Sequence, residues 1–286
     1  MRSFKEIIEI CESQKLSFPE AVLFLQSEEE GKDKAKIFSL MEDRLEDMGR
    51  SVEEALSGTW NGMLSSDPTS LMSDYFNSND PLSGSFIFRA CQISMSVASC
   101  NSCMGRIVAA PTAGSCGIIP GLLFSWKEKE RLCTCELTNA LITAAGVGEV
   151  IAKRATLAGA EGGCQAECGS AAAMGSAALV YLRNGSAEAI TQSAAITIKS
   201  VMGLVCDPVA GLVEIPCIKR NGTLVSLAAI SADMALAGVN SMIPPDEVLD
   251  AMSKVGKSIP ETLRETGLGG VAATDTGKRL AEKLGQ

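Results

Sequence analysis

The segment Ser170 to Leu182, SAAAMGSAALVYL, is the clearest indication of the fold. Its alanine, glycine and serine residues favour a helix and let the backbones of neighbouring helices approach closely. Similar small-residue runs recur from residue 86 onward, separated by loops rich in glycine and proline. Aromatic residues make up only 4% of the chain and alternating β-branched residues are scarce, so a sheet is disfavoured. We therefore predict an all-α fold, a compact multi-helix domain whose Gly/Pro-rich loops carry the site.

The N-terminal part of the chain has a different pattern. Ser17 and Glu20 have the spacing of a capping box and predict a helix that begins near Ser17. An amphipathic helix is predicted from Ala35 to Leu56, before a polar, turn-rich segment from Ser57 to Pro81. We therefore predict an N-terminal helical appendage at residues 1–62 and a helical main domain at residues 63–286. In the main domain, helices are predicted at 86–106, 121–131, 137–158, 170–182, 187–204, 224–242 and 246–255, with a loosely structured segment at 262–283.

The charge and hydropathy of the chain argue against several classes of partner. The formal net charge is −9 and no basic run is longer than Lys219-Arg220, so the clustered cations that bind nucleic acid are missing. The apolar stretches 137–152 and 223–243 are interrupted by Glu149 and Asp233, which disfavours membrane spans. The first twelve residues carry charges where a secretory signal needs an apolar segment. We expect a cytoplasmic protein that binds neither nucleic acid nor a membrane.

Cysteine and histidine occur in unusual numbers. The eleven cysteines do not indicate a disulfide framework in a reducing cytoplasm, so some are expected to be metal ligands and most to be core residues. The chain has no histidine, which excludes a Ser–His–Asp triad, His-ligated zinc and a histidine general base within it. Any imidazole that the reaction needs must come from another chain.

The loop from Ala109 to Gly121 is the first of three Gly/Pro-rich segments that place polar groups between the predicted helices. Its backbone N–H groups and the hydroxyls of Thr112 and Ser115 can be directed at one anion, beside the positive end of the next helix. A small carboxylate would fit such a site. Taken alone, a loop of this kind is more often a tight turn between helices.

The other two segments contain cysteines. Cys164 and Cys168 lie in a glycine-flanked turn before an alanine-rich helix, whose N-terminus favours the thiolate that a metal binds. Small buried core residues are an equal alternative for both. Cys206 and Cys217 bracket a loop stiffened by prolines, at a spacing that matches neither zinc nor ferredoxin sites.

Four further cysteines are expected to be structural. Cys100 and Cys103 have a C-x-x-C spacing, but they lie in a predicted helix without the preceding strand of a thioredoxin-like site. Cys133 and Cys135 lie in a short connector between helices.

Three motifs become informative when they are taken together. They are Ile107 to Gly121, the Gly163-Cys164-Gln165 turn, and Cys206-Asp207-Pro208 running to Ile215-Pro216-Cys217. In combination they closely resemble the bacterial iron–sulfur L-serine dehydratases, a family independent of pyridoxal phosphate, and the resemblance covers the chain from Met63 to the C-terminus. It implies a [4Fe–4S] cluster on Cys164, Cys206 and Cys217, with the fourth iron open to substrate. Cys168 is the alternative for the first ligand.

The resemblance also implies a partner. The complete enzyme of the family has an α/β domain, fused or separately encoded, that contains the proposed catalytic histidines. This chain lacks that domain, so we expect it to be the α subunit of a hetero-oligomer with a separate β (α/β) subunit that supplies the base. Some members close the open iron with a C-terminal cysteine, a device that is expected to be absent here because the chain ends Lys283-Leu284-Gly285-Gln286.

The reaction implied is the elimination of water from L-serine. The open iron is expected to act as a Lewis acid on the serine hydroxyl, and aminoacrylate then becomes pyruvate and ammonia. An exposed cluster also implies loss of activity in air. The residues expected to hold the substrate carboxylate are Thr112, Gly114, Ser115 and Gly117.

Other interpretations of the function are compatible with the same residues. No general base is identified in this chain, since Glu149, Lys153 and Glu167 lie near the motifs but are equally suited to capping or ion pairing. A cysteine desulfidase-type β-elimination could use the same scaffold. A non-catalytic iron–sulfur or zinc module for scaffolding or redox sensing, or a set of purely structural cysteines, are the remaining alternatives.

Overall fold

The protein is described here by a computed structural model that covers residues 1–285. This part of the chain contains thirteen α-helices, five short helical turns and no β-strand, so the predicted all-α fold is confirmed. The helices are α1 (Phe4–Gln14), α2 (Phe18–Glu30), α3 (Lys34–Ser57), α4 (Thr69–Ser78), α5 (Gly84–Ser102), α6 (Ile118–Glu130), α7 (Thr134–Arg154), α8 (Gly159–Gly162), α9 (Ser170–Leu182), α10 (Ala187–Val201), α11 (Cys217–Leu236), α12 (Pro245–Ser258) and α13 (Asp275–Lys283). The short turns are η1 (Ala113–Ser115), η2 (Gln165–Gly169), η3 (Val209–Gly211), η4 (Glu261–Leu263) and η5 (Gly270–Ala273).

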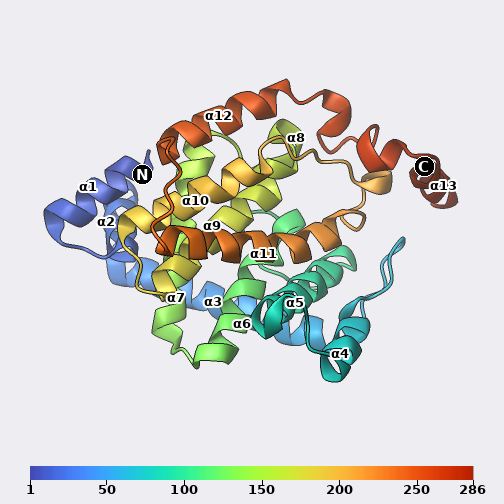
Figure 1. Ribbon diagram of the computed structural model, residues 1–286, viewed down its shortest axis with the longest axis horizontal. Coiled ribbons are helices and arrows are strands. Elements are labelled where there is room, and N and C mark those ends of the chain that lie inside the picture. Colours follow the sequence, from blue (N-terminus) through green and yellow to red (C-terminus); the bar gives the residue numbers. More distant parts are fainter. Residues whose placement is uncertain (286) are drawn as a thin grey trace.

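Helix α9, the alanine-rich segment, lies at the centre of the bundle. It packs against α7, α10, α11 and α6, and Figure 1 shows it in the middle of the molecule. Every residue from Ser170 to Val180 is buried. Gly175 shows why small residues are needed, because a Cβ there would lie 2.4 Å from Leu122 Cδ1 of α6. The small residues of α9 therefore permit the close helix packing that the sequence predicts.

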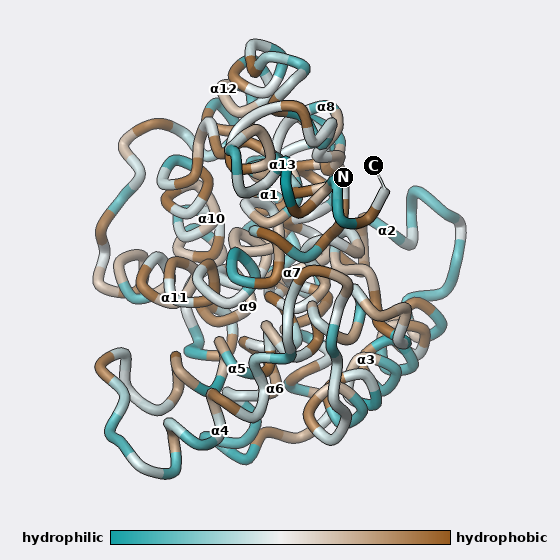
Figure 2. The backbone as a smooth tube through the Cα atoms, turned by 90° about the vertical axis from the view of Figure 1, so that its right-hand side faces the viewer, coloured by the Kyte–Doolittle hydropathy of each residue, from teal (hydrophilic) through white to brown (hydrophobic). Residues whose placement is uncertain are grey.

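Helices α1, α2 and α3 pack onto the same hydrophobic core as the later helices. Phe4, Phe18 and Leu45 belong to one cluster of buried residues that also includes α7 and α9. The predicted capping box is present, since the Ser17 N–H donates to the Glu20 carboxylate at 2.8 Å. Figure 2 shows hydrophilic residues along the outer side of α3. The division into an appendage at 1–62 and a main domain at 63–286 stays a prediction.

Helix α11 begins at Cys217, seven residues before the predicted start at 224. The Asn221-Gly222 pair is typical of turns, which is why the sequence favours a later start. Both residues are instead buried within the helix. Gly222 is needed where α5 crosses, because a Cβ there would lie 2.6 Å from Met95 Cγ. Cys217 is therefore the first residue of a helix and not part of a loop.

The expectation of a loosely structured segment at 262–283 is wrong for much of that segment. It contains η5 and α13, and Arg264 forms an isolated parallel bridge with Cys206. The segment is polar and rich in glycine, so its own sequence gives little sign of order. Its order comes from contacts with a loop that lies far away in the sequence.

Helix α7 is the one helix in residues 1–285 that is long and apolar enough to cross a membrane. However, 67% of its most apolar 18-residue window is buried inside the molecule. The apolar composition of α7 is therefore explained by its place in the core.

Candidate functional site

Cys164 lies in a turn that glycine makes possible. Gly163 has a φ angle of +76°, and a Cβ there would lie 2.8 Å from the carbonyl oxygen of Leu204. The chain then forms η2, a single π-helical turn, before α9 begins. Such wide turns are frequent at functional sites. The Gln165 N–H donates to the Leu204 carbonyl at 3.0 Å, which ties the Cys164 turn to the segment that leads into Cys206.

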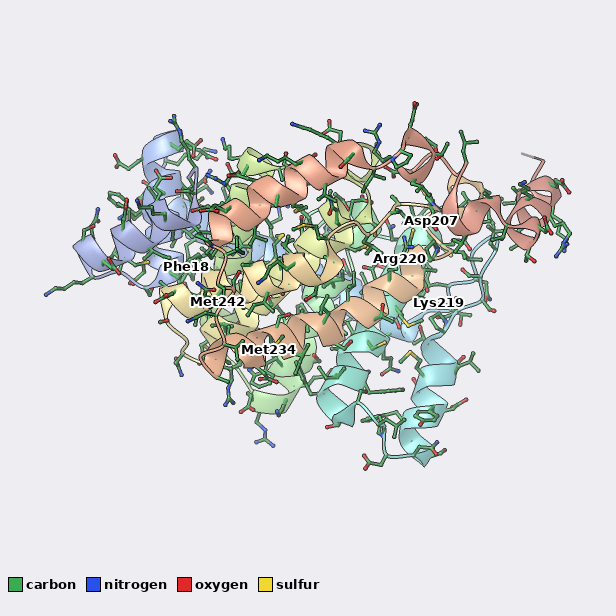
Figure 3. All side chains as sticks on the ribbon, turned by 45° about the horizontal axis from the view of Figure 1, so that its top comes forward. Phe18, Asp207, Lys219, Arg220, Met234 and Met242 are labelled. Atoms are coloured by element: carbon green, nitrogen blue, oxygen red, sulfur yellow. The ribbon has the colours of Figure 1, made fainter. Side chains whose placement is uncertain are left out.

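Cys206 is fixed by the C-terminal segment and by α11. Its N–H donates to the carbonyl of Leu263 at 2.9 Å. The next residue, Asp207, is buried and forms an ion pair with Arg220 of α11 at 2.8 Å. The second carboxylate oxygen of Asp207 accepts from the Val271 N–H at 2.8 Å. Figure 3 shows Asp207 and Arg220 beside each other, so Cys206 is anchored near the first turn of α11.

Glu214 fixes the loop that precedes Cys217. Its carboxylate is 2% exposed and accepts hydrogen bonds from the N–H groups of Met63, Leu64 and Ser65, each at 2.9 Å. The Ser65 hydroxyl adds a fourth donor at 2.7 Å. These donors satisfy a buried carboxylate without a cation. The loop is thereby tied to a segment 150 residues earlier in the chain.

The thiols of Cys164, Cys206 and Cys217 are neighbours. Burial raises the pKa of Cys217 to about 12, and the nearby Cys164 adds to this rise. Burial, followed by the proximity of Cys164 and Cys217, raises the pKa of Cys206 well above its ordinary value. Cys164 differs, because the neighbouring Cys168 and the nearby Arg220 guanidinium lower its pKa in spite of burial. The neighbouring Cys164 and burial raise the pKa of Cys168 instead.

The three neighbouring thiols are not arranged around a single ion. Across residues 1–285, no group of three or more Cys, Asp or Glu side chains could hold one metal ion. The arrangement therefore does not match a structural zinc site, in which all ligands contact one metal at about 2.3 Å.

The loop from Thr112 to Gly117 lies next to these cysteines. The Cys168 sulfur is 3.8 Å from the Gly114 carbonyl oxygen. The N–H groups of Ala113 and Gly114 begin the turn η1, and neither has an acceptor among the described residues. Ala113 is exposed and Gly114 is half-buried. The loop therefore presents two free backbone donors at its accessible edge.

Ser115 and Gly117 are buried in this loop, and their polar groups already have partners. The Ser115 hydroxyl hydrogen-bonds within the loop. The Gly117 N–H donates to Asn221 Oδ1 at 3.0 Å, while Asn221 Nδ2 donates to the carbonyl oxygens of Gly114 at 2.7 Å and of Cys217 at 3.0 Å. Asn221 therefore joins the loop to the first turn of α11. The sequence does not identify Asn221, because its only signal is an i+4 spacing from Cys217.

Glu167 lies between the loop and Cys206. Its Oε2 atom is 3.8 Å from the Cys206 sulfur. A Cβ on Gly114 would lie 3.3 Å from Glu167 Oε1. Burial raises the pKa of the Glu167 carboxyl, and the nearby hydroxyl of Thr112 partly opposes this rise. A carboxyl group thus stands at the junction of the loop and the cysteines.

Four other cysteines have their side chains in different surroundings. Cys100 and Cys116 are buried in a separate hydrophobic cluster, and burial raises their pKa values to about 11 and about 12. Cys133 and Cys135 are exposed at the start of α7. These placements are compatible with structural roles.

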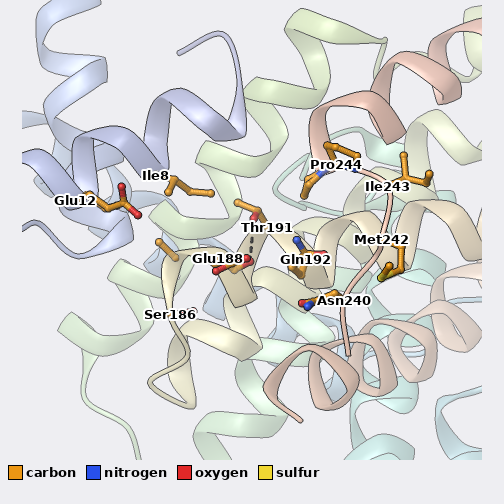
Figure 4. Close-up of a pocket in the computed structure, with 13 residues that line it drawn as sticks. Ile8, Glu12, Ser186, Glu188, Thr191, Gln192, Asn240, Met242, Ile243 and Pro244 are labelled. Atoms are coloured by element: carbon orange, nitrogen blue, oxygen red, sulfur yellow. Dashed lines mark hydrogen bonds between the residues drawn. The ribbon is translucent and has the colours of Figure 1, made fainter. Parts of the chain in front are cut away.

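A pocket of about 840 Å³ lies at the opposite end of α11. It is lined by residues of α1, of α10 and of the connection between α11 and α12, including Glu12, Glu188 and Met242 (Figure 4). Arg220 is in the first turn of α11 and Met242 follows its last turn, and a helix of 20 residues is about 30 Å long. No residue of the three motifs lines this pocket, so it is separate from the cysteine site.

Comparison with known proteins identifies the family. Residues 13–272 match the model of the serine dehydratase alpha chain family. The chain belongs to this family. It is 44% identical over 285 residues to the probable L-serine dehydratase alpha chain of Bacillus subtilis, which covers 99% of this chain and 95% of that protein. It is 52% identical over 207 residues to the L-serine dehydratase alpha chain of Peptoniphilus asaccharolyticus, covering 72% of this chain and 71% of the relative. The resemblance inferred from the three motifs is confirmed.

Some relatives are longer single chains. The L-serine dehydratase of Helicobacter pylori is 34% identical over 281 residues, a match that covers 95% of this chain but 61% of that protein. The shorter relatives are named as alpha chains, which implies a second chain in those enzymes. The longer relatives therefore contain further sequence that this chain does not match.

Proposed function

We propose that this chain is the α subunit of an L-serine dehydratase and that Cys164, Cys206 and Cys217 hold a [4Fe–4S] cluster. The observation that supports this most is the proximity of the buried thiols of Cys164 and Cys206 and the half-buried thiol of Cys217, next to a loop with free backbone donors. When bound, the cluster would supply an iron without a protein ligand, which can act as a Lewis acid toward the serine hydroxyl.

The contacts of Cys164 favour it over Cys168 as the first ligand. Cys164 lies beside the Arg220 guanidinium, which stabilises a thiolate. Cys168 is fully buried, and its thiol donates to the Gly114 carbonyl oxygen at 3.8 Å. In this proposal Cys168 supports the first ligand, and three thiolates rather than four contact the cluster.

The loop from Thr112 to Gly117 is proposed to bind the substrate carboxylate. The free N–H groups of Ala113 and Gly114 are available to a carboxylate at the accessible edge, beside the Thr112 hydroxyl, which bonds to the Ser115 hydroxyl at 3.0 Å. Ser115 and Gly117 contribute differently, because their polar groups are already bonded within the protein. Their role is to fix the loop conformation, so that the Cα–H and C–O bonds of serine are oriented for elimination.

A base from a separate β subunit is proposed to remove the Cα proton. This chain contains no histidine, and the relatives named as alpha chains support the existence of a second chain. The α subunit would then bind and orient serine, while the interface with the β subunit completes the site. We therefore propose a hetero-oligomer, with the cytoplasmic location expected from the sequence.

The proposal is tested by anaerobic co-purification of this chain with its β subunit, followed by iron analysis and a pyruvate assay. We expect bound iron and faster pyruvate formation from L-serine than from L-cysteine. Cys206→Ser should lose iron and activity, whereas the exposed Cys135→Ser should keep both. A colourless, iron-free complex would contradict the cluster, and a clear preference for L-cysteine would assign the chain to β-elimination of sulfide instead.

A further inference from the structure

Three acidic side chains lie at the proposed site, and two of them have well-defined partners. Asp207 forms an ion pair with Arg220 at 2.8 Å, and Glu214 accepts from three N–H groups and one hydroxyl. Glu167 differs from both, because no Lys or Arg side chain in residues 1–285 forms an ion pair with it. Glu167 is half-buried, so its carboxyl group is free to pair with a positively charged group of a ligand.

The position of Glu167 is fixed by close packing. A Cβ on Gly159 would lie 2.5 Å from Glu167 Oε2, and one on Gly114 would lie 3.3 Å from Oε1. In the position observed, the carboxyl group occupies space that a side chain at Gly159 would fill and lies close to Gly114. It is held between the Thr112 hydroxyl on one side and the Cys206 sulfur, 3.8 Å away, on the other.

We propose that Glu167 binds the α-ammonium group of the substrate and makes the site specific for amino acids, an inference that rests on the proposed function. In L-serine the ammonium group is attached to the carbon between the carboxylate and the CH₂OH group. With the carboxylate on the Thr112–Gly117 loop and the hydroxyl directed toward the cysteines, the ammonium group faces the space between them. That space is where Glu167 lies.

The same placement explains how a carboxylate can bind so close to an acidic side chain. Glu167 is beside Gly114, whose N–H is a proposed donor to the substrate carboxylate, so the two negative charges would repel each other. An ammonium group between them removes the repulsion. A hydroxy acid without the ammonium group would therefore bind poorly, although it has the same carboxylate and hydroxyl.

The test uses the complete enzyme, with its β subunit and iron, and two competitive inhibitors. D-Serine carries the ammonium group and 3-hydroxypropionate does not. In the wild-type enzyme we expect 3-hydroxypropionate to bind at least about tenfold more weakly than D-serine. Glu167→Gln, which keeps the shape of the side chain, should raise the KM for L-serine and the Ki of D-serine by about ten- to a hundred-fold. The Ki of 3-hydroxypropionate should stay the same or fall.

Two matched variants and iron analysis complete the experiment. Glu265→Gln removes an exposed carboxylate whose charge acts on Glu167, and it should change the KM for L-serine by less than about twofold. Glu167→Asp keeps the negative charge, so its KM for L-serine should rise less than that of Glu167→Gln. This second variant keeps the inference testable if Glu167→Gln loses iron.

Three results would overturn the inference. The first is equal binding of D-serine and 3-hydroxypropionate by the wild-type enzyme. The second is an equal rise, in Glu167→Gln, of the KM for L-serine and of the Ki values of both inhibitors. The third is a requirement for added potassium that Glu167→Gln abolishes, which would assign the carboxylate to a metal cation. Turnover of L-serine by the wild-type enzyme is measured in the same samples, so failure of the proposed function is distinguished from failure of this inference.

Discussion

Asn221→Ala removes the two hydrogen bonds that join the Thr112–Gly117 loop to α11, and a third to the Cys217 carbonyl within α11. The buried Gly117 N–H loses its acceptor, and the Gly114 carbonyl oxygen keeps only the contact of 3.8 Å with the Cys168 sulfur. A buried polar group without a partner costs about 1–3 kcal/mol, and the half-buried Gly114 carbonyl keeps its sulfur contact, so the free energy of unfolding should fall by about 1–3 kcal/mol through the Gly117 N–H alone. This is a large share of the stability of a typical protein, which is about 5–15 kcal/mol.

The assay is urea unfolding of the metal-free protein, followed by circular dichroism. Ser226→Ala is the matched control, since it lies on the exposed face of the same helix and its hydroxyl bonds only to the Thr223 carbonyl. The control should change the free energy of unfolding by less than about 0.5 kcal/mol. If Asn221→Ala were as stable as the control, the Asn221 side chain would not hold the Thr112–Gly117 loop in place, and other contacts would have to do so.

The remaining predictions concern the cysteines and the buried carboxylate. Glu214→Gln should lower the free energy of unfolding by about 1.5–3 kcal/mol, because an NH₂ group replaces one acceptor of a buried charged network; unchanged urea unfolding would be inconsistent with the contacts described. Cys164→Ser should lose bound iron in an anaerobic iron assay, whereas Cys168→Ser should retain most of it. Loss of iron from Cys168→Ser but not from Cys164→Ser would make Cys168 the first ligand. Iodoacetamide at pH 7 should modify Cys133 but not Cys116, as measured by mass spectrometry, because Cys133 is exposed whereas burial raises the pKa of Cys116 to about 12. Raising the pH to about 9 should leave Cys116 unmodified, since its thiolate forms only near the raised value, and equal labelling of both residues would argue against the buried position of Cys116.

The helical part of the fold could be predicted from local sequence. Small residues such as those of α9 favour both a helix and close packing, so Ser170–Leu182 follows from its composition. The start of α11 could not be predicted, because Asn221-Gly222 has the sequence of a turn. Its helical conformation depends on α5, which crosses at Gly222. Local sequence preference does not predict the conformation of a residue whose position depends on packing against a distant segment of the chain.

The candidate site could be predicted only in part, for a similar reason. The family resemblance supplies Cys164, Cys206 and Cys217, and their ligand role stays a prediction. The residues that hold the site together are not apparent in the sequence, because Asn221 bonds to groups more than 100 residues away and Glu214 to groups about 150 residues away. Neither belongs to a local pattern, and each is identified only by its buried hydrogen bonds.

The most direct test of the account is Mössbauer spectroscopy of the enzyme reconstituted with ⁵⁷Fe, recorded with and without L-serine. We expect L-serine to shift the signal of one iron of the cluster and to leave the other three unchanged, because a thiolate already binds each of the other three. A spectrum that L-serine does not alter, in an enzyme that turns over L-serine, would contradict the proposal that substrate binds at an iron without a protein ligand.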